Sequence, residues 1–353
     1  MIRFKIDITF INREKEMAEL RNYLEGRPNS ILFLYGPKSS GKTTLMYRLF
    51  EQIEAEKRYE INFLNLREIL LTSYDDFIDA FFFKSSSAEN GLKAGILRQY
   101  SLFGLFKLDA FTEKMLKKHQ EDPFLIMKRE FQRLIKKGIQ PVVIIDEFHK
   151  LDGLYLPDKQ KRLMVELMNF FVAMTKESHL CQVIIASSDA FFIEQVYVDS
   201  KLRKTSKFMK LDYFEKEDIF AWLRDIKKYN QVHEYTLDEK QIETIWDTVG
   251  GSAWEIHSIL EDLFQYSIDT IVSKIKRAKV AMIAEWTFDD EARNCLLRHF
   301  RKQPIRKLTE LAGTGKKLLG QALYYDPVDG IYGIQGKSLE WGIKGYFEEL
   351  ERI

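Results

Sequence analysis

Residues 31–44 read ILFLYGPKSSGKTT, an apolar run that leads directly into a glycine-rich turn. The run is typical of a strand that is buried on both faces of a parallel sheet. Residues 36–44 match the pattern G-x-x-x-x-G-K-[ST] in full, and helical spacing of apolar residues follows. A strand, a glycine-rich loop and a helix in this order predict a doubly wound α/β fold whose first loop binds phosphate.

Each fixed position of this loop meets a physical demand of phosphate binding. Gly36 lets the chain turn sharply out of the strand, and Gly41 brings backbone N–H groups close to a β-phosphate. We expect Lys42 to span the β- and γ-phosphates and the Thr43 hydroxyl to ligate Mg²⁺. The other expected nucleotide-binding positions are Pro37, Lys38, Ser39, Ser40 and Thr44. The predicted ligands are therefore ATP or ADP together with Mg²⁺.

A second apolar run, VVIIDE at 142–147, ends in two carboxylates. Asp146 is placed to hold the Mg²⁺ ion, directly or through water. Glu147 is placed to polarise an attacking water molecule as general base. Alone, the pair would also suit an ordinary acidic strand end, but together with the upstream loop it predicts hydrolysis of ATP to ADP and phosphate.

A third apolar run, VIIASSD at 183–189, also ends in polar residues. Because the carboxyl ends of parallel strands converge on the ligand crevice, Ser187 or Ser188 could position the attacking water or sense the γ-phosphate. Equally, Ser188 or Asp189 could cap the next helix. The sequence leaves both interpretations open.

The rest of the N-terminal part alternates between strands and helices, with one interruption. Further strands are predicted at 59–66 and 207–211, and helices at 42–57, 159–176 and 189–198. Residues 68–138 instead predict a helical insertion, with helices at 74–83, 103–116 and 123–134 and a loop at 85–91. The aromatic run at 81–83 either packs against the sheet or offers a surface to a protein partner.

From residue 214 onward the pattern becomes helical. Amphipathic blocks occupy 218–228, 237–248 and 254–266, and a longer helix is expected at 268–285. The Gly250-Gly251 pair stops the second block, and Ser252 caps the third.

The last segment, 288–353, has the pattern of a winged helix-turn-helix. Its helices are expected at 291–300, 304–311 and 316–324, and its wing at 330–337. Between residues 296 and 320 there are seven Lys or Arg and one acid, which suits phosphate contacts on duplex DNA. Winged helices also dock proteins or act as intramolecular modules, so a DNA partner and a protein partner both stay open.

With these motifs in place, residues 8–265 resemble the STAND class of AAA+-related P-loop NTPases, and most closely the archaeal ATPase family. Besides the glycine-rich loop and Asp146-Glu147, the resemblance rests on FINREKE at 10–16, the strand end at 186–188, Leu211-x-x-Phe214 and GGSAW at 250–254. It implies that the helical block after residue 214 is a lid that closes over the nucleotide. Ala253 stands where the family usually has proline, in a segment that lies near the base and ribose.

The resemblance also implies roles for residues outside the motifs. Ile11, Asn12 and Arg13 would line the adenine pocket. Asn12 could also cap a helix that has acids in its first turn, and both roles can hold at once. Arg203 falls where the family often has an arginine before the fifth strand. It would reach the γ-phosphate in cis or from a neighbouring molecule, or else belong to a solvated basic loop.

Composition limits the remaining function classes. The chain has 353 residues, 45% of them hydrophobic, and a net charge of +1, so any basic surface must be local. Its two cysteines, Cys181 and Cys295, lie in apolar segments and are expected to be buried free thiols, and no paired CxxC elements suggest zinc. The most apolar runs are four or five residues long, too short to span a bilayer, so we expect a cytoplasmic protein.

These observations predict an AAA+/STAND-like P-loop NTPase. An α/β parallel-sheet core would occupy 1–212, a helical lid 213–286 and a C-terminal winged-helix domain 287–353. We expect a slow ATPase that acts as a molecular switch and couples its nucleotide state to the winged helix, which contacts DNA or a protein. The alternative is a DNA-binding regulator in which the nucleotide is only a structural ligand.

Overall fold

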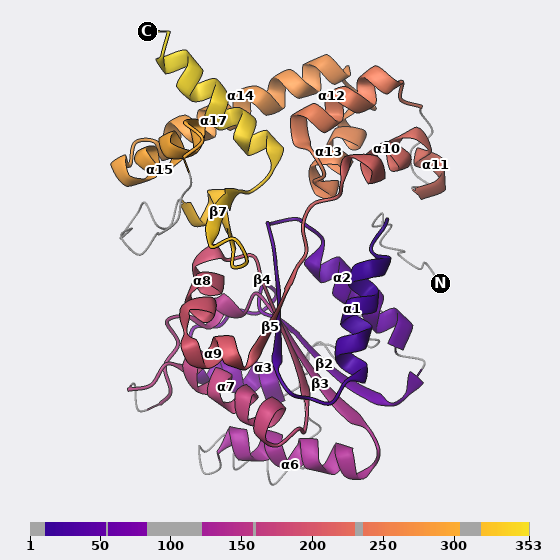
Figure 1. The fold of residues 1–353 in the computed structure, drawn as a ribbon, viewed down its shortest axis with the longest axis vertical. Coiled ribbons are helices and arrows are strands. Elements are labelled where there is room, and N and C mark those ends of the chain that lie inside the picture. Colours follow the sequence, from indigo (N-terminus) through magenta and orange to yellow (C-terminus); the bar gives the residue numbers. More distant parts are fainter. Residues whose placement is uncertain are drawn as a thin grey trace.

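The computed structural model describes residues 11–53, 56–82, 122–157, 160–229, 236–303 and 319–352. At its centre lies a parallel sheet of five strands in the order β2-β3-β4-β1-β5 (Figure 1). The strands are β1 (Ile31–Tyr35), β2 (Tyr59–Asn65), β3 (Gln140–Asp146), β4 (Gln182–Ser187) and β5 (Ser206–Lys210). All five strands that the sequence predicted are present, and they confirm the parallel sheet.

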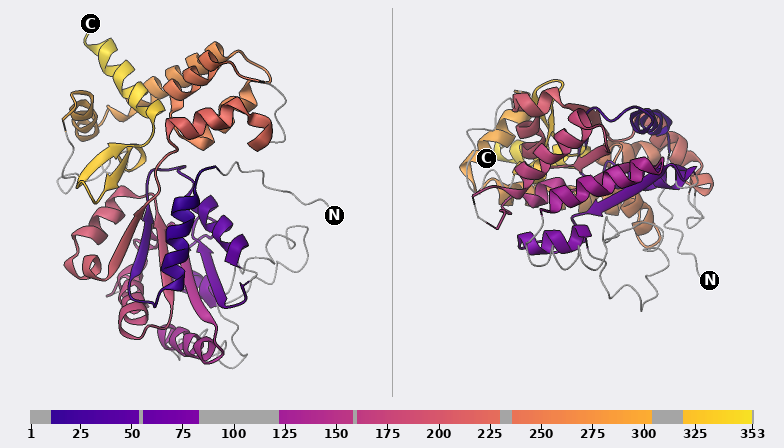
Figure 2. Two further views of the ribbon diagram at one scale, coloured as in Figure 1. Left: turned by 45° about the vertical axis from the view of Figure 1, so that its right-hand side comes forward. Right: turned by 90° about the horizontal axis from the view of Figure 1, so that it is seen from below.

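Helices cover both faces of the sheet, so its three central strands, β1, β3 and β4, are buried almost throughout. On one face, Leu32 and Leu34 of β1 join a core with α1 (Glu14–Glu25) and α2 (Lys42–Ile53). On the other face, Phe33 joins a core with the remaining helices of this part of the chain (Figure 2). These are α3 (Tyr74–Phe82), α6 (Pro123–Lys136), α7 (Leu163–Val172) and α8 (Ala190–Val198), and the short α9 (Ser200–Lys204) leads into β5.

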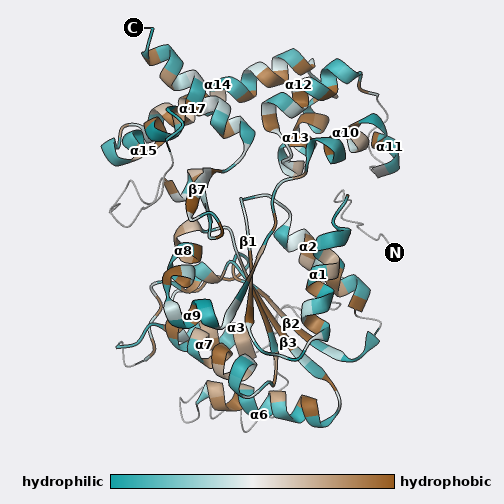
Figure 3. Cartoon of the chain, viewed as in Figure 1, coloured by the Kyte–Doolittle hydropathy of each residue, from teal (hydrophilic) through white to brown (hydrophobic). Residues whose placement is uncertain are grey.

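The predicted insertion packs against the sheet in its described parts. Phe77, Phe81 and Phe82 of α3 are buried in the same core as Phe33. Figure 3 shows the apolar strands enclosed by helices whose outer faces are hydrophilic. The predicted loop at 85–91 and helix at 103–116 lie outside the described residues.

A helical block lies beyond the carboxyl ends of the strands (Figure 1). It consists of α10 (Lys216–Arg224), α11 (Ile226–Tyr229), α12 (Glu239–Val249) and α13 (Ala253–Asp262), and we call it the lid block. Gly250 ends α12 with a φ of +61°, and the Ser252 side chain caps α13, as predicted. A Cβ on Gly251 would lie 1.9 Å from the carbonyl oxygen of Phe214, so only glycine allows this close approach.

The long helix α14 (Ile268–Trp286) connects the lid block to the C-terminal segment, by which we mean the described residues from 287 to 352. This segment contains α15 (Asp290–Phe300), the antiparallel pair β6 (Leu323–Asp326) and β7 (Ile331–Ile334), and α17 (Lys337–Leu350). The predicted helix at 304–311 lies outside the described residues.

One prediction for this segment was wrong, and one helix was missed. The helix expected at 316–324 does not extend to Tyr324, which pairs with Gly333 in the ladder between β6 and β7. The helix α17 was not predicted at all, because Gly342 and Gly345 weaken its helical pattern. Gly342 has a packing reason, since a Cβ there would lie 2.8 Å from Cβ of Lys279 on α14.

Two simpler properties complete the fold. Cys181 and Cys295 are buried and free, as expected. Within the described ranges, no helix combines the length and apolar character that crossing a membrane requires.

Candidate nucleotide-binding site

The glycine-rich loop connects the last residue of β1 to the first turn of α2. A Cβ on Gly36 would lie 2.1 Å from the carbonyl oxygen of Leu211, so glycine is required there by close packing. A Cβ on Gly41 would meet nothing within 4 Å, but its φ of +94° belongs to the region that L-residues rarely adopt. Among the described protein atoms, the backbone conformation is therefore the reason for glycine at position 41, and the close approach to a phosphate stays a prediction.

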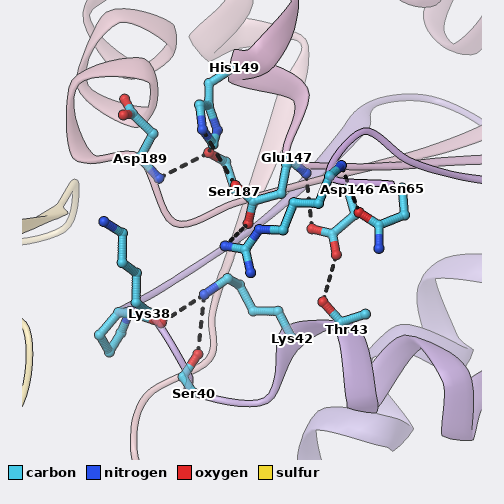
Figure 4. Close-up of polar contacts among 12 residues, drawn as sticks. Lys38, Ser40, Lys42, Thr43, Asn65, Asp146, Glu147, His149, Ser187 and Asp189 are labelled. Atoms are coloured by element: carbon cyan, nitrogen blue, oxygen red, sulfur yellow. Dashed lines mark hydrogen bonds and ion pairs between the residues drawn. The ribbon is translucent and has the colours of Figure 1, made fainter. Parts of the chain in front are cut away.

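Lys42 occupies the centre of this loop. Its Nζ donates to the carbonyl oxygens of Gly36 (3.0 Å) and Pro37 (2.7 Å). It also lies 3.3 Å from the Ser40 hydroxyl (Figure 4). The side chain is 6% exposed, and this burial lowers the pKa of the ammonium to about 8, against the opposing effect of nearby carboxylates. A buried cation inside a ring of backbone groups is suited to a phosphate ligand.

Thr43 and Asp146 come together from α2 and β3. The Thr43 hydroxyl donates to Oδ2 of Asp146 over 2.6 Å. Burial raises the pKa of the Asp146 carboxyl, and the hydrogen bond from Thr43 works in the opposite direction. A hydroxyl beside a carboxylate, next to a phosphate loop, fits Mg²⁺, which prefers oxygen ligands and takes the others from phosphates and water. Both residues predicted as metal ligands therefore lie together.

Glu147 has an unusual backbone conformation and two charged neighbours. Its φ of +59° is left-handed, a strained arrangement that is common at functional sites. Its side chain is buried, with Oε1 2.6 Å from the Arg67 guanidinium and Oε2 3.4 Å from Nε2 of His149. The candidate general base is therefore held between two neighbouring groups that the sequence analysis did not identify.

At the end of β4, the structure distinguishes the residue that caps the next helix from the residue that faces the cavity. Asp189 caps α8, because its side chain accepts a hydrogen bond from the Phe192 amide. Ser187 lies 3.0 Å from Nδ1 of His149, and Ser188 is buried and faces the same cavity as the glycine-rich loop. Thus Asp189 is the cap, and Ser188 is the serine that reaches the cavity.

A cavity of about 510 Å³ lies between the glycine-rich loop and the lid block. On the sheet side it is lined by the loop, Arg67, Glu147 and Ser188, and Arg13 and Phe214 lie between the two sides. On the lid side it is lined by Ala253, Trp254, His257, Ser258 and Glu261, all from α13. We call it the nucleotide cavity.

The residues predicted to line an adenine pocket have different surroundings. Arg13 lines the nucleotide cavity: its guanidinium lies 4.1 Å from the ring centroid of Phe214 and donates to the carbonyl oxygen of Asp212. Ile11 packs into the core of the lid block, and Asn12 donates to Asp218. Asn12 does not cap α1, because Arg13 holds the N-cap position without a side-chain hydrogen bond.

Arg203 does not reach the cavity in this structure. It precedes β5, whose first residue pairs with Ile31, whereas the glycine-rich loop follows the last residue of β1. Its guanidinium instead lies over the ring of Tyr197, 4.5 Å from the centroid. A contact with the γ-phosphate of a neighbouring molecule stays a prediction.

Known proteins resemble this chain in sequence and in structure. Residues 10–259 match the family of ATPase domains that is found predominantly in Archaea. The uncharacterized ATP-binding protein MJ1006 of Methanocaldococcus jannaschii is 38% identical over 242 residues, which are 66% of this chain and 64% of that protein. A second, MJ1659, is 31% identical over 300 residues, 81% and 80% of the two chains. The match thus spans less than two thirds of MJ1006.

Two solved structures have the same arrangement at low sequence identity. The Walker-type ATPase PABY2304 of Pyrococcus abyssi superposes with a TM-score of 0.61 at 16% identity, covering 95% of this chain and 96% of that one. The ORC2 protein of Aeropyrum pernix, in its ADPNP and ADP complexes, gives 0.50 at 12% identity, covering 100% and 98%. At such identities the likeness shows the fold alone.

Proposed function

The chain belongs to the family of ATPase domains found predominantly in Archaea, and from this premise we propose that it is a switch driven by slow ATP hydrolysis. One observation carries the proposal: the phosphate loop, Asp146 and Glu147 line or adjoin a single cavity that the lid block closes from the other side. The division expected from the sequence, at 1–212, 213–286 and 287–353, is part of this proposal.

In this proposal, different residues of the cavity bind the phosphates, hold Mg²⁺ and activate the attacking water. Backbone N–H groups of the loop and the Lys42 ammonium would hold the phosphates. Thr43 and Asp146 would hold Mg²⁺, which supplies positive charge to the phosphate oxygens when it is bound. Glu147 would orient the attacking water and accept its proton.

Slow turnover is expected from the state of Glu147. Its two carboxylate oxygens face Arg67 and His149, so part of their capacity to accept hydrogen bonds is already used before a water molecule binds. Ser188 would sense the γ-phosphate from the end of β4. The lid residues, Trp254 among them, would cover the base and ribose.

The test of this proposal is the substitution Glu147→Gln. We expect phosphate release to fall by about two orders of magnitude or more, because the amide cannot accept the proton, while ATP binding is retained. Glu51→Gln is the matched control, since Glu51 is half exposed on α2 and pairs with Arg48. Phosphate release at the wild-type rate from the Glu147→Gln protein would remove Glu147 as the general base.

The output of the switch is proposed to be the C-terminal segment acting as a winged helix. The helix α15 and the β6–β7 hairpin fit its first helix and wing, and the basic stretch within 296–320 would contact duplex DNA. Phosphate release measured with and without duplex DNA, at two salt concentrations, tests this. Stimulation that weakens with salt supports the DNA-coupled switch. Release absent under every condition supports the alternative, a DNA-binding regulator with a structural nucleotide.

A protein partner is the other proposed output, and the insertion at 68–138 or the winged helix would bind it. Proteins that co-purify with the Glu147→Gln protein in its ATP state, and are lost in ADP, would identify such a partner. Proteins recovered equally in both nucleotides would speak against a partner that depends on the switch.

A further inference from the structure

Lys38, in the glycine-rich loop, is held by two other parts of the chain. Its backbone N–H donates to Oε1 of Gln335 (2.9 Å), and its ammonium donates to the carbonyl oxygen of Gly320 (3.3 Å). Its own carbonyl oxygen accepts a hydrogen bond from the Tyr213 hydroxyl over 2.8 Å. Gln335 is itself fixed, because its Nε2 donates to the carbonyl oxygen of Leu323. The C-terminal segment therefore holds the phosphate loop at this residue.

Lys38 also lies between two cavities and lines each of them. One is the nucleotide cavity, and the other, of about 450 Å³, lies against α8 and Gly320. Of the described residues, Lys38 is the one that lines both. In Figure 4 its side chain points away from Lys42, and its ammonium lies on the same side of the loop as Asp189. The ammonium is thus at the boundary of the nucleotide cavity and outside the centre of the loop.

Lys38 and Glu147, the proposed general base, both line the nucleotide cavity. Burial lowers the pKa of the Lys38 ammonium, while the carboxylates of Asp189 and Glu147 raise it and Arg67 lowers it. The water that Glu147 would orient must lie between Glu147 and the γ-phosphate.

The other Lys and Arg side chains that line the described part of the cavity are already engaged. Arg67 is paired with Glu147, and Arg13 with Glu16. Lys42 lies within the loop carbonyls. Among the described residues, the Lys38 ammonium instead donates to a neutral carbonyl of a different segment, that of Gly320.

We propose that Lys38 is a further catalytic residue of the hydrolysis proposed above, and that the C-terminal segment controls it. When the segment moves, the Lys38 ammonium leaves the Gly320 carbonyl and stabilises the negative charge on the γ-phosphate. In that step the water oxygen bonds to the γ-phosphorus, and the bond to the bridging oxygen breaks with its electron pair remaining on ADP. The water proton passes to Glu147. This inference rests on the proposed function.

The first experiment measures phosphate release and nucleotide affinity for Lys38→Ala in the full chain. We expect kcat to fall at least about tenfold, because a cation at the γ-phosphate stabilises mainly the transition state. The dissociation constant for ATP should change by no more than about threefold. Lys344→Ala, at an exposed position on α17, is the matched control. An unchanged kcat, or a loss confined to affinity, would overturn the catalytic role.

The second experiment releases Lys38 from the C-terminal segment with Gln335→Ala. We expect kcat to rise at least about threefold, because the loop is no longer held at Lys38. Tyr332→Phe is the control: it removes a contact between the same segment and Glu194 on α8, away from the loop, and should leave kcat unchanged. The double variant Lys38→Ala/Gln335→Ala should behave as Lys38→Ala alone. Acceleration that survives in the double variant would overturn the inference.

The same measurements distinguish this inference from the function on which it rests. Wild-type phosphate release no higher than that of Glu147→Gln would overturn both. Wild-type release well above Glu147→Gln, together with an equally active Lys38→Ala, would overturn the role of Lys38 and leave the proposed ATPase intact.

Discussion

The two glycines of the phosphate loop carry different constraints. A Cβ on Gly36 collides with the Leu211 carbonyl, whereas one on Gly41 has room and only the backbone conformation is unfavourable. We expect Gly36→Ala to lower the free energy of unfolding by about 3 kcal/mol or more, and Gly41→Ala by about 1 kcal/mol. Urea unfolding of both variants measures the difference. Equal losses would show that the packing at Gly36 relaxes easily.

The buried Lys42 ammonium predicts a pH dependence of stability. Its pKa is about 8 in the folded chain and is expected to be near the ordinary 10.5 when the chain unfolds. Between these values the unfolded state binds more protons, so the free energy of unfolding rises with pH, in total by about 3 kcal/mol. The free energy of unfolding of the wild type, measured by urea titration, should therefore increase relative to that of Lys42→Met between pH 8 and pH 10. A constant difference would contradict the shift.

The sequence predicted those site residues whose positions a motif fixes. Lys42, Thr43, Asp146 and Glu147 follow directly from the loop and from the end of β3. Arg67 was not found, because its contact with Glu147 depends on how β2 aligns with β3. His149 lies only two residues after Glu147, but it belongs to none of the motifs that the sequence analysis used. Asn65, at the end of β2, pairs with Asp146, and this register brings Arg67 beside Glu147. No local pattern contains that information.

At the scale of elements, the packing of α17 against α14 offers a test. A Cβ on Gly342 would lie 2.8 Å from Cβ of Lys279 and 3.0 Å from its backbone carbon. We expect Gly342→Ala to destabilise the protein by about 1–3 kcal/mol through overpacking, despite the better helix propensity of alanine. Lys344→Ala, on the exposed side of the same helix, should cost less than about 0.5 kcal/mol. A stabilised Gly342→Ala protein would show that the two helices can move apart.

The predictability of the elements follows from what their patterns depend on. The three central strands of the sheet are buried on both faces, so their apolar runs are clear in the sequence. The helix α17 has glycines at Gly342 and Gly345 where it packs closely against α14. Tyr324 is in a strand because it pairs with Gly333 of β7. Both are consequences of a neighbour, which propensity and periodicity do not include.

At the scale of the whole molecule, the C-terminal segment connects to both sides of the nucleotide cavity. Asp326 pairs with Lys210 at the end of β5, while Lys337 pairs with Asp247 of the lid block. The sequence predicted a separate module here but could not place it, because these partners are far apart along the chain. The lid block cannot shift far from the sheet without disturbing one of these contacts.

The position of Trp254 gives the molecule an optical signal of its own. Trp254 lines the nucleotide cavity and is 67% exposed, whereas Trp222 and Trp286, two of the other four tryptophans, are buried. Indole emission depends on contact with water, so closure of the lid block over ATP should shift the intrinsic fluorescence to shorter wavelength. We expect Trp254→Phe to lose this shift and Trp246→Phe to keep it. Nucleotide occupancy could then be followed in real time, without any attached dye.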